Sequence, residues 1–320
     1  MTHIAAICMG YGYHPLAGAS SNYHRPMLIN RARPASVALE TTLLLHGVPK
    51  GEGKALAFDL AGIVQEHGGH PVLVGVVGGL PTVGLNNDEL ETLLAAPEVT
   101  KANTSNLGTL IARKQHAATT VSTTMELAAA AGVQVFATGG LGGVHKGYGS
   151  QLDISADLAA FTRFPVAVVA SGVKSILDVV ATREALEALG VPVVGYQTDH
   201  FPAFYLRESN ARMDARFDDV DDLASFVRHE LARTGRGIVV CNPIPGASEL
   251  ARGDWERWLA DAETEAGRQG VTGRGMTPFL LAHLHRVSKG ATLRANVDLV
   301  RSNAALAAQI ARRLVPSDRA

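Results

Sequence analysis

Short apolar runs alternate along the chain with longer segments in which hydrophobic residues recur at helical spacing. The runs are rich in β-branched residues and have the length of buried strands. The predicted strands are Ser36–Glu40, Pro71–Val77, Val133–Thr138, Pro165–Ala170, Val191–Tyr196 and Gly237–Cys241. The predicted helices cover 51–67, 87–96, 119–131, 174–189, 218–234, 248–268, 277–288 and 293–314.

Local signals support these boundaries. Asn87, followed by Glu91, indicates the start of one helix, and four glycines indicate helix ends. These glycines are Gly132, Gly190, Gly235 and Gly290. Alternation of strands and helices predicts an α/β fold with helices on both faces of a sheet, a three-layer α/β/α sandwich. Because no repeat, low-complexity tract or linker is evident, we expect one domain over 35–315, after an irregular glycine-rich extension over 1–34.

Composition excludes several classes of protein. Of the 320 residues, 47% are hydrophobic, which is enough for a substantial core and excludes wholesale disorder. The formal net charge is -1 and no basic block is interleaved with aromatic residues, so we expect no nucleic-acid partner. No apolar stretch approaches the roughly 20 residues of a membrane span, so we expect no membrane partner. Cys8 and Cys241 lack metal-type spacing, and no secretory signal is evident, which favours a reduced, cytoplasmic protein.

Polar side chains stand at the ends of several predicted strands. Glu40 ends SVALE, Thr138 ends VQVFAT, Lys174 follows PVAVVASGV and Asn242 follows GIVVC. In open α/β sheets, ligands bind beyond the carboxyl ends of the strands. We therefore expect these four groups to converge on one cleft, although strand ends commonly carry polar residues.

Lys174 lies between a buried strand and a helix, and Glu40 lies at the end of another. A buried lysine is pushed towards its neutral form, which attacks carbonyl carbons to form an imine. A carboxyl at the end of an apolar strand suits proton transfer. The alternatives are a solvated lysine that starts a helix, and a carboxylate paired with a nearby arginine or lysine.

The segment Thr138–Gly147, with the sequence TGGLGGVHKG, is the densest glycine cluster. Closely spaced glycines let backbone N–H groups approach an anion or a planar ring. Neither common phosphate motif fits, because His145 replaces the last glycine of G-x-G-x-x-G and no Gly-Lys-Ser/Thr follows. The alternative is a mobile glycine loop with His145 on the surface.

The neighbouring segment Asp153–Asp157, with the sequence DISAD, has two interpretations. If it is extended, Asp153, Ser155 and Asp157 point the same way. If a helix starts at Ser155, that serine caps it and Asp157 lies in the first turn. One carboxylate here could anchor a hard divalent ion that keeps several waters, Mg²⁺ or Mn²⁺, and the donors have no zinc character.

Eight ordered blocks carry a family resemblance. They are VALETTLLLHGVP, FATGGLGGVHKG, LDISADL, VASGVKSILD, GYQTDHFPAFY, NPIP, TPFLLA and ANVDLVRSNA. Over roughly residues 35–314, the chain resembles the pseudouridine-5'-phosphate glycosidase family, which includes indigoidine-cluster relatives. The resemblance implies a cytoplasmic homotrimer of α/β/α fold that uses Mn²⁺. Its implied activity is reversible cleavage of the C–C bond between uracil and ribose 5-phosphate.

The resemblance also implies roles for single residues. Glu40 resembles the family's proton donor, Lys174 its nucleophile, which forms an imine with the ring-opened sugar, and Asp153 its manganese ligand. The residues that resemble substrate contacts are Lys101, Val121, Thr138, His145, Ser155, Ala156, Asp157 and Asn296. Among them, Lys101 resembles a phosphate-binding lysine, and Thr138, His145 and Asn296 resemble groups around the base and its scissile bond.

The chain departs from the family pattern at several places. Residues 48–53, with the sequence VPKGEG, replace a typical Tyr-Pro-x-Asn segment, NTSNL stands where Arg-Arg-Asp-Leu is common, and Arg294 replaces a glutamate. These departures predict a changed pocket mouth around conserved chemistry. They leave open a biosynthetic C-glycosynthase that joins ribose 5-phosphate to another ring, as in alnumycin-type or C-nucleoside pathways. A third alternative is a non-catalytic sugar-phosphate-binding protein.

Overall fold

The computed structural model describes residues 28–149, 152–271 and 276–315. Its strands are β1 (Ile29–Asn30), β2 (Ser36–Glu40), β3 (His70–Val77), β4 (Leu80–Val83), β5 (Thr100–Ala102), β6 (Ala117–Thr119), β7 (Val135–Ala137), β8 (Ala167–Ala170), β9 (Val193–Tyr196), β10 (Ala215–Phe217) and β11 (Ile238–Cys241). Its helices are α1 (Thr42–His46), α2 (Gly53–Glu66), α3 (Asn87–Ala95), α4 (Leu107–Ala112), α5 (Val121–Ala130), α6 (Ala156–Phe161), α7 (Val179–Ala188), α8 (Val220–Thr234), α9 (Arg252–Arg268), α10 (Met276–Val287) and α11 (Ala291–Leu314).

All the strands belong to one sheet with the order β1-β4-β3-β2-β7-β8-β11-β9-β10, and β6 joins β3 to β5. Every pairing is parallel except those of β4 and β6 with β3. The six predicted strands are confirmed as β2, β3, β7, β8, β9 and β11. The central strands β7, β8 and β11 are buried throughout, as expected for strands that are covered on both faces.

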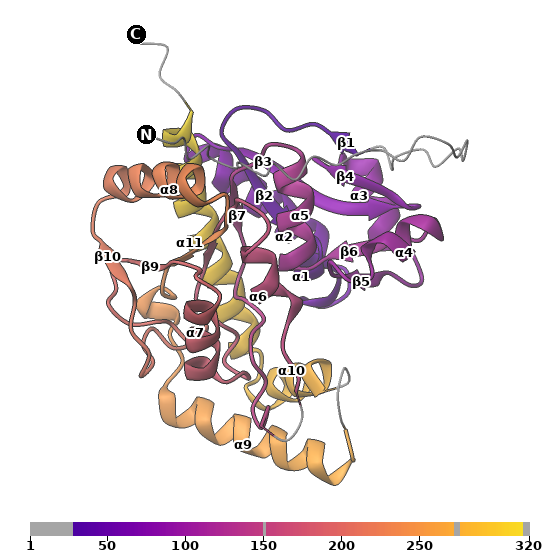
Figure 1. The fold of residues 1–320 in the computed structure, drawn as a ribbon. Helices are drawn as coiled ribbons and strands as arrows, with labels where there is room; N and C mark the ends of the chain where they lie inside the picture. The colour runs from indigo at the N-terminus through magenta and orange to yellow at the C-terminus, as the bar shows by residue number, and fades with distance from the viewer. Residues whose placement is uncertain (1–27, 150–151, 272–275, 316–320) are drawn as a thin grey trace, which may run out of the picture.

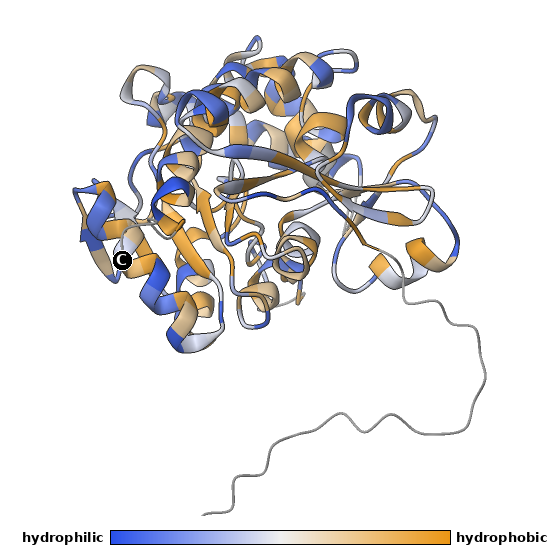
Figure 2. Cartoon of the chain, turned by 90° about the horizontal axis from the view of Figure 1, so that it is seen from above, coloured by the Kyte–Doolittle hydropathy of each residue, from blue (hydrophilic) through white to orange (hydrophobic). Residues whose placement is uncertain are grey.

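Helices flank this sheet, which confirms the predicted α/β fold. The long helix α11 packs on β2, β7 and β8, with α2 and α8 beside it, whereas α5 packs on β2, β3 and β7 together with α6. Figure 1 shows α9 and α10 beyond one end of the sheet. In Figure 2, many interior strand segments are hydrophobic, and hydrophilic residues lie mainly on the outer helices and loops.

The structure confirms the predicted start of α3 and corrects that of α7. Helix α3 begins at Asn87, and its cap is Asn86, whose side chain forms a reciprocal capping box with Glu89. Helix α7 begins at Val179, capped by Asp178, and not at position 174. Residues 174–177 instead form a turn in which the N–H of Leu177 donates to the carbonyl of Lys174 at 2.9 Å.

Part of the predicted N-terminal extension contacts the sheet. Strand β1 pairs in parallel with β4, with Ile29 opposite Thr82, and residues 1–27 lie outside the described residues. Cys241 is buried and forms no disulfide, whereas Cys8 lies outside the described residues. Within the described residues, no helix is both long enough and apolar enough to cross a membrane.

Candidate active site

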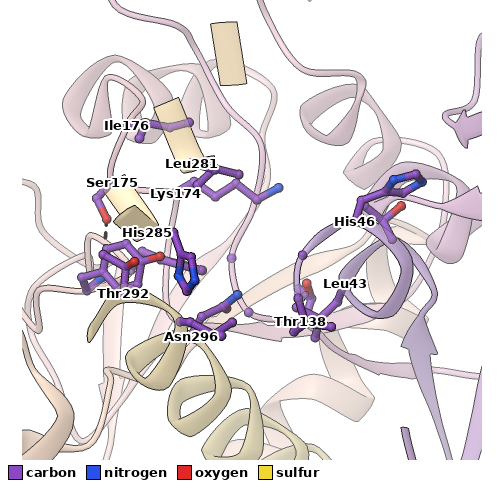
Figure 3. Close-up of a pocket in the computed structure, with 18 of the residues that line it drawn as sticks. Leu43, His46, Thr138, Lys174, Ser175, Ile176, Leu281, His285, Thr292 and Asn296 are labelled. Carbon is purple, nitrogen blue, oxygen red and sulfur yellow. Dashed lines mark hydrogen bonds between the residues drawn. The ribbon is translucent and has the colours of Figure 1, made fainter. Parts of the chain in front are cut away.

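A cavity of about 700 Å³ lies beyond the carboxyl ends of β2, β7 and β8, between α1 on one side and α10 and α11 on the other. Five residues that the sequence singled out line it: Glu40, Lys101, Thr138, Lys174 and Asn296. Figure 3 shows the Lys174 side chain extending between a wall that carries His285 and a wall that carries Leu43 and Thr138. The predicted convergence of the carboxylate, the hydroxyl and the lysine amine is confirmed.

Glu40 has the properties of a proton donor. The Thr138 hydroxyl donates a hydrogen bond to its Oε1 atom. Burial raises the pKa of Glu40, and the charge of Lys174 and the Thr138 hydrogen bond oppose this rise only in part. A carboxyl with a raised pKa keeps its proton at a pH where an exposed glutamate has lost it, so Glu40 can act as an acid.

Two lysines share the site with this carboxyl. The backbone N–H of Lys174 donates to the Leu141 carbonyl at 3.1 Å, which ties the lysine's turn to the glycine-rich segment. Burial, followed by the charge of Lys174, lowers the pKa of Lys101, while Glu40 opposes that shift. The cavity therefore holds two mutually repelling amines and one carboxyl, an arrangement that an anionic ligand would relieve.

Asn242, the fourth predicted group, does not line the cavity, which corrects the expectation that all four groups converge there. Its amide donates to Ser302 Oγ at 2.9 Å and to Asn303 Oδ1 at 3.1 Å. Asn303 in turn donates to the Thr138 carbonyl at 2.8 Å. The sequence offered only a weak signal for Asn303, a polar residue among the mainly apolar buried residues of α11. This buried network attaches α11 to the strand ends under the cavity.

The glycine-rich segment is closely packed. A Cβ atom on Gly142 would lie 2.3 Å from Ser155 Oγ, and one on Gly140 would lie 2.5 Å from Cδ2 of Phe204. Real Cβ contacts are not that short, so side chains at these positions would displace their neighbours. The glycines are thus needed for close approach to α6 and to the aromatic wall of the cavity.

The segment Asp153–Asp157 follows the helical interpretation. Ser155 caps α6, because its Oγ accepts from the N–H of Asp157 at 3.2 Å. The Asp157 carboxylate is buried and accepts from the N–H groups of Ser122 and Gly142, both at 2.9 Å. Val121 is buried at the start of α5 and Ala156 begins α6. Ser155 and Asp157 therefore contact the glycine-rich segment at Gly142. None of the four residues Val121, Ser155, Ala156 and Asp157 lines the cavity.

His145 and Asp153 lie together, also outside the cavity lining. The His145 N–H donates to the Asp153 carbonyl at 3.0 Å, and His145 Nδ1 lies 4.0 Å from Asp153 Oδ2. The Asp153 side chain is 42% exposed, so water can reach its carboxylate. No group of three or more His, Cys, Asp or Glu side chains with metal-binding geometry occurs in the described residues. A single accessible carboxylate fits an ion that keeps most of its waters.

Several cavity residues were missed in the sequence. Phe204 has a positive φ of 59°, a strained value for a bulky residue, and its ring packs against Gly139 and Gly140. His46 and His285 line opposite walls, and neither falls in a recognisable catalytic motif. Thr42 Oγ1, and Asn296 Oδ1 on a residue that the sequence did single out, are buried and have no hydrogen-bond partner in the described structure. Such unpaired polar atoms in a cavity wall indicate a ligand that forms hydrogen bonds with them.

The fold and the site together define an α/β enzyme with a lysine and a protonatable carboxyl at the carboxyl edge of a parallel sheet. The chain belongs to the indigoidine synthase A like protein family, whose model matches residues 28–313.

Curated relatives and solved structures agree with this assignment. The chain is 44% identical over 289 residues to a pseudouridine-5'-phosphate glycosidase from Symbiobacterium thermophilum, covering 88% of this chain and 93% of that one. It is 44% identical over 286 residues to pseudouridine-5'-phosphate glycosidase 2 from Rhizobium johnstonii, covering 89% and 92%.

Among solved structures, an indigoidine synthase A-like protein from Thermotoga maritima is similar with a TM-score of 0.83 and 34% identity, covering 93% of this chain and 99% of that one. The prealnumycin C-glycosynthase AlnA, solved in complex with ribulose 5-phosphate, is similar with a TM-score of 0.81 and 33% identity, covering 88% and 92%.

Proposed function

We propose that this chain is a C-glycosidase that reversibly cleaves pseudouridine 5'-phosphate to uracil and ribose 5-phosphate. The observation that carries this proposal is the meeting of Lys174 with the protonatable Glu40 in one cavity, with Lys101 alongside. A C–C glycosidic bond has no leaving oxygen to protonate, in contrast to an O-glycoside. Its cleavage needs an electron sink at C1', which a lysine imine supplies.

The first half of the reaction opens the sugar. Electrons of the uracil ring expel O4' from C1', and Glu40 gives its proton to O4'. The neutral amine of Lys174 then adds to C1', the electrons return to the ring, and Glu40 takes the proton released by the new C1'–N bond. Glu40 is suited to this exchange because burial holds its pKa above the usual range.

The second half breaks the C–C bond. Glu40 protonates C5 of the ring, the lone pair on the Lys174 nitrogen forms C1'=N, and the C1'–C5 electron pair restores the double bond of uracil. Water then adds to the imine, with Glu40 accepting a proton, and collapse of this adduct releases ribose 5-phosphate and the free amine. Glu40 ends protonated, so the cycle consumes one water and no other reagent.

The polar groups of the cavity suggest how the substrate lies. The Lys101 ammonium matches a phosphate, and its pKa, lowered by burial and then by Lys174, is expected to rise when a dianion binds. Asn296 Oδ1 is a buried acceptor without a partner, which suits an N–H group of the base. A Cβ atom on Gly139 would lie 3.1 Å from this oxygen, which places it next to Thr138, the partner of Glu40.

We also propose that Asp153 binds Mn²⁺ with water completing the coordination, and that the chain forms a homotrimer. The accessible Asp153 carboxylate beside His145 supports the metal proposal. When bound, the ion would supply positive charge to ligand oxygens near the glycine-rich segment. The roles of His145, Ser155, Ala156, Asp157 and Val121 in substrate binding, and the cytoplasmic location, stay predictions.

The alternative is synthesis of a different C-glycoside from the same sugar phosphate. The similarity to AlnA favours it, as does the placement of Val48 and Pro49, from the segment that departs from the family pattern, on the cavity wall. Incubation of the protein with ribose 5-phosphate and a panel of candidate rings would separate the two, since uracil and the other rings give products of different mass.

The direct test is an assay of purified protein with pseudouridine 5'-phosphate, with Mn²⁺ added and after chelation. We expect release of equal amounts of uracil and ribose 5-phosphate, and loss of activity after chelation that added Mn²⁺ restores. No uracil at micromolar enzyme would refute the glycosidase proposal. Full activity after chelation would refute only the metal proposal.

A further inference from the structure

The wall of the cavity opposite α1 is built by α10 and the first turns of α11. Its lining residues are Leu281, Ala282, His285, Thr292, Leu293 and Asn296. His285 is the one ionisable side chain in this set, and the aliphatic residues give the rest of the wall an apolar character. A mainly apolar wall with a few polar groups is typical of a site for a flat ring.

The position of this wall relates it to the ring half of the substrate. Lys174 acts at C1' and Glu40 transfers protons around it, whereas Lys101, the candidate phosphate ligand, comes from β5, which is joined to β3 through β6. With the sugar phosphate held between these groups, the ring attached to C1' must extend towards α10 and α11. This step rests on the proposed function.

His285 has unused hydrogen-bonding capacity. Its carbonyl accepts from the N–H of Gly290 at 3.1 Å and from Ser288 Oγ at 3.3 Å, which fixes its backbone at the end of α10. Its imidazole has no hydrogen bond or ion pair in the described part of the chain, although it lines the cavity. Thr292, its polar neighbour on this wall, is already bonded through Oγ1 to Ser288 Oγ at 3.1 Å.

His285 and Asn296 together offer complementary groups. Asn296 Oδ1 can only accept, whereas a neutral imidazole donates from one nitrogen. Both residues line the cavity from the wall built by α10 and α11, and in the view of Figure 3 both lie on the same side of Lys174. We propose that His285 is a specificity-determining residue that donates a hydrogen bond to a carbonyl oxygen of the ring, while Asn296 accepts from the neighbouring N–H. The site is therefore selective for rings with adjacent carbonyl and N–H groups.

The test compares His285→Ala and His285→Gln with wild type in two assays. Cleavage of pseudouridine 5'-phosphate depends on both the ring and the sugar, whereas borohydride trapping of ribose 5-phosphate on Lys174 depends on the sugar alone. We expect His285→Ala to raise KM for cleavage about 10-fold to 100-fold, as loss of a binding contact does, and to leave trapping unchanged. His285→Gln keeps a side-chain donor and should recover most of the loss.

His229→Ala is the matched control, because His229 is exposed on α8, away from the cavity lining. Cleavage by His285→Ala at the rate of this control would overturn the inference and leave the proposed function intact. Equal loss of cleavage and trapping would overturn it too, since His285 would then act on the sugar or on the fold. A wild type that traps ribose 5-phosphate but releases no uracil would instead refute the proposed function itself.

Discussion

At the scale of single residues, the proposed chemistry depends on a buried carboxyl whose pKa is raised. Burial raises the pKa of Glu40, and the opposing influence of Lys174 and Thr138 is smaller. Replacement by glutamine keeps the shape and an acceptor for the Thr138 hydroxyl but removes the transferable proton. We expect Glu40→Gln to lower kcat/KM by about 10²-fold to 10⁴-fold.

The control for this loss is Glu66→Gln, at the exposed end of α2. Steady-state assays of uracil release would show wild-type rates for the control. In wild type, kcat/KM should fall as the pH rises through the pKa of Glu40, because the acid form is lost. Wild-type activity in Glu40→Gln would exclude this residue as the proton donor.

The same carboxyl makes stability depend on pH. Because the pKa of Glu40 is higher in the folded than in the unfolded state, the native state binds its proton more tightly. The resulting stabilisation is complete below the unfolded pKa and is lost as the pH rises through the folded pKa. Denaturant melts across this window should show a decline in the free energy of unfolding that is smaller in Glu40→Gln. Parallel curves for both proteins would contradict the raised pKa.

At the scale of elements, the glycine-rich segment is held by its contacts with α6. A Cβ atom on Gly142 would lie 2.3 Å from Ser155 Oγ and 2.7 Å from Asp157 Oδ2. We expect Gly142→Ala to lower the free energy of unfolding by about 1–3 kcal/mol through overpacking. In Gly62→Ala, within α2, a Cβ atom would meet nothing within 4 Å, so this change should stabilise by about 0.5–1 kcal/mol.

Thermal and denaturant melts measure both variants, and the opposite signs are the decisive feature. Equal effects of the two substitutions would mean that the close approach to α6 does not limit the residue at position 142.

The sequence predicted the long, buried elements well. The six strands with continuous apolar runs and the eight helical segments are all present. The missed strands β1, β4, β5, β6 and β10 have two to four residues and lack the continuous apolar runs that marked the predicted strands. The missed helices α1 and α4 have five and six residues, whereas α6 was one of the two interpretations of the segment Asp153–Asp157. Such short elements are stabilised by contacts with distant parts of the chain, and a local sequence pattern does not reveal these contacts.

The candidate site was predictable to a similar degree. Strand ends and family motifs correctly brought Glu40, Thr138 and Lys174 together. Asn242 does not line the cavity, because its amide donates hydrogen bonds to Ser302 and Asn303, about sixty positions later in the chain. The wall that carries His285 could not be predicted, since it depends on how α10 is placed over the ends of distant strands.

At the scale of the whole molecule, the proposal makes a claim about oligomeric state, namely that three chains associate. A homotrimer predicts a mass of about three times the 33.6 kDa of the chain in sedimentation equilibrium. We expect this mass to persist on dilution through the concentrations used in assays. A chain that sediments as a monomer while it cleaves pseudouridine 5'-phosphate would contradict the trimer and leave the mechanism unaffected.

The central claim is that the Lys174 amine carries the sugar as an imine in the cavity beyond β2, β7 and β8. The most direct test incubates the whole protein with ribose 5-phosphate and borohydride, then locates the adduct by peptide mass spectrometry. Lys174→Arg is the test variant, and Lys54→Arg, an exposed lysine paired with Glu91, is the matched control. We predict one adduct on Lys174 in wild type and in the control, and none in Lys174→Arg. An adduct on Lys101, or no adduct in an active wild type, would contradict the account.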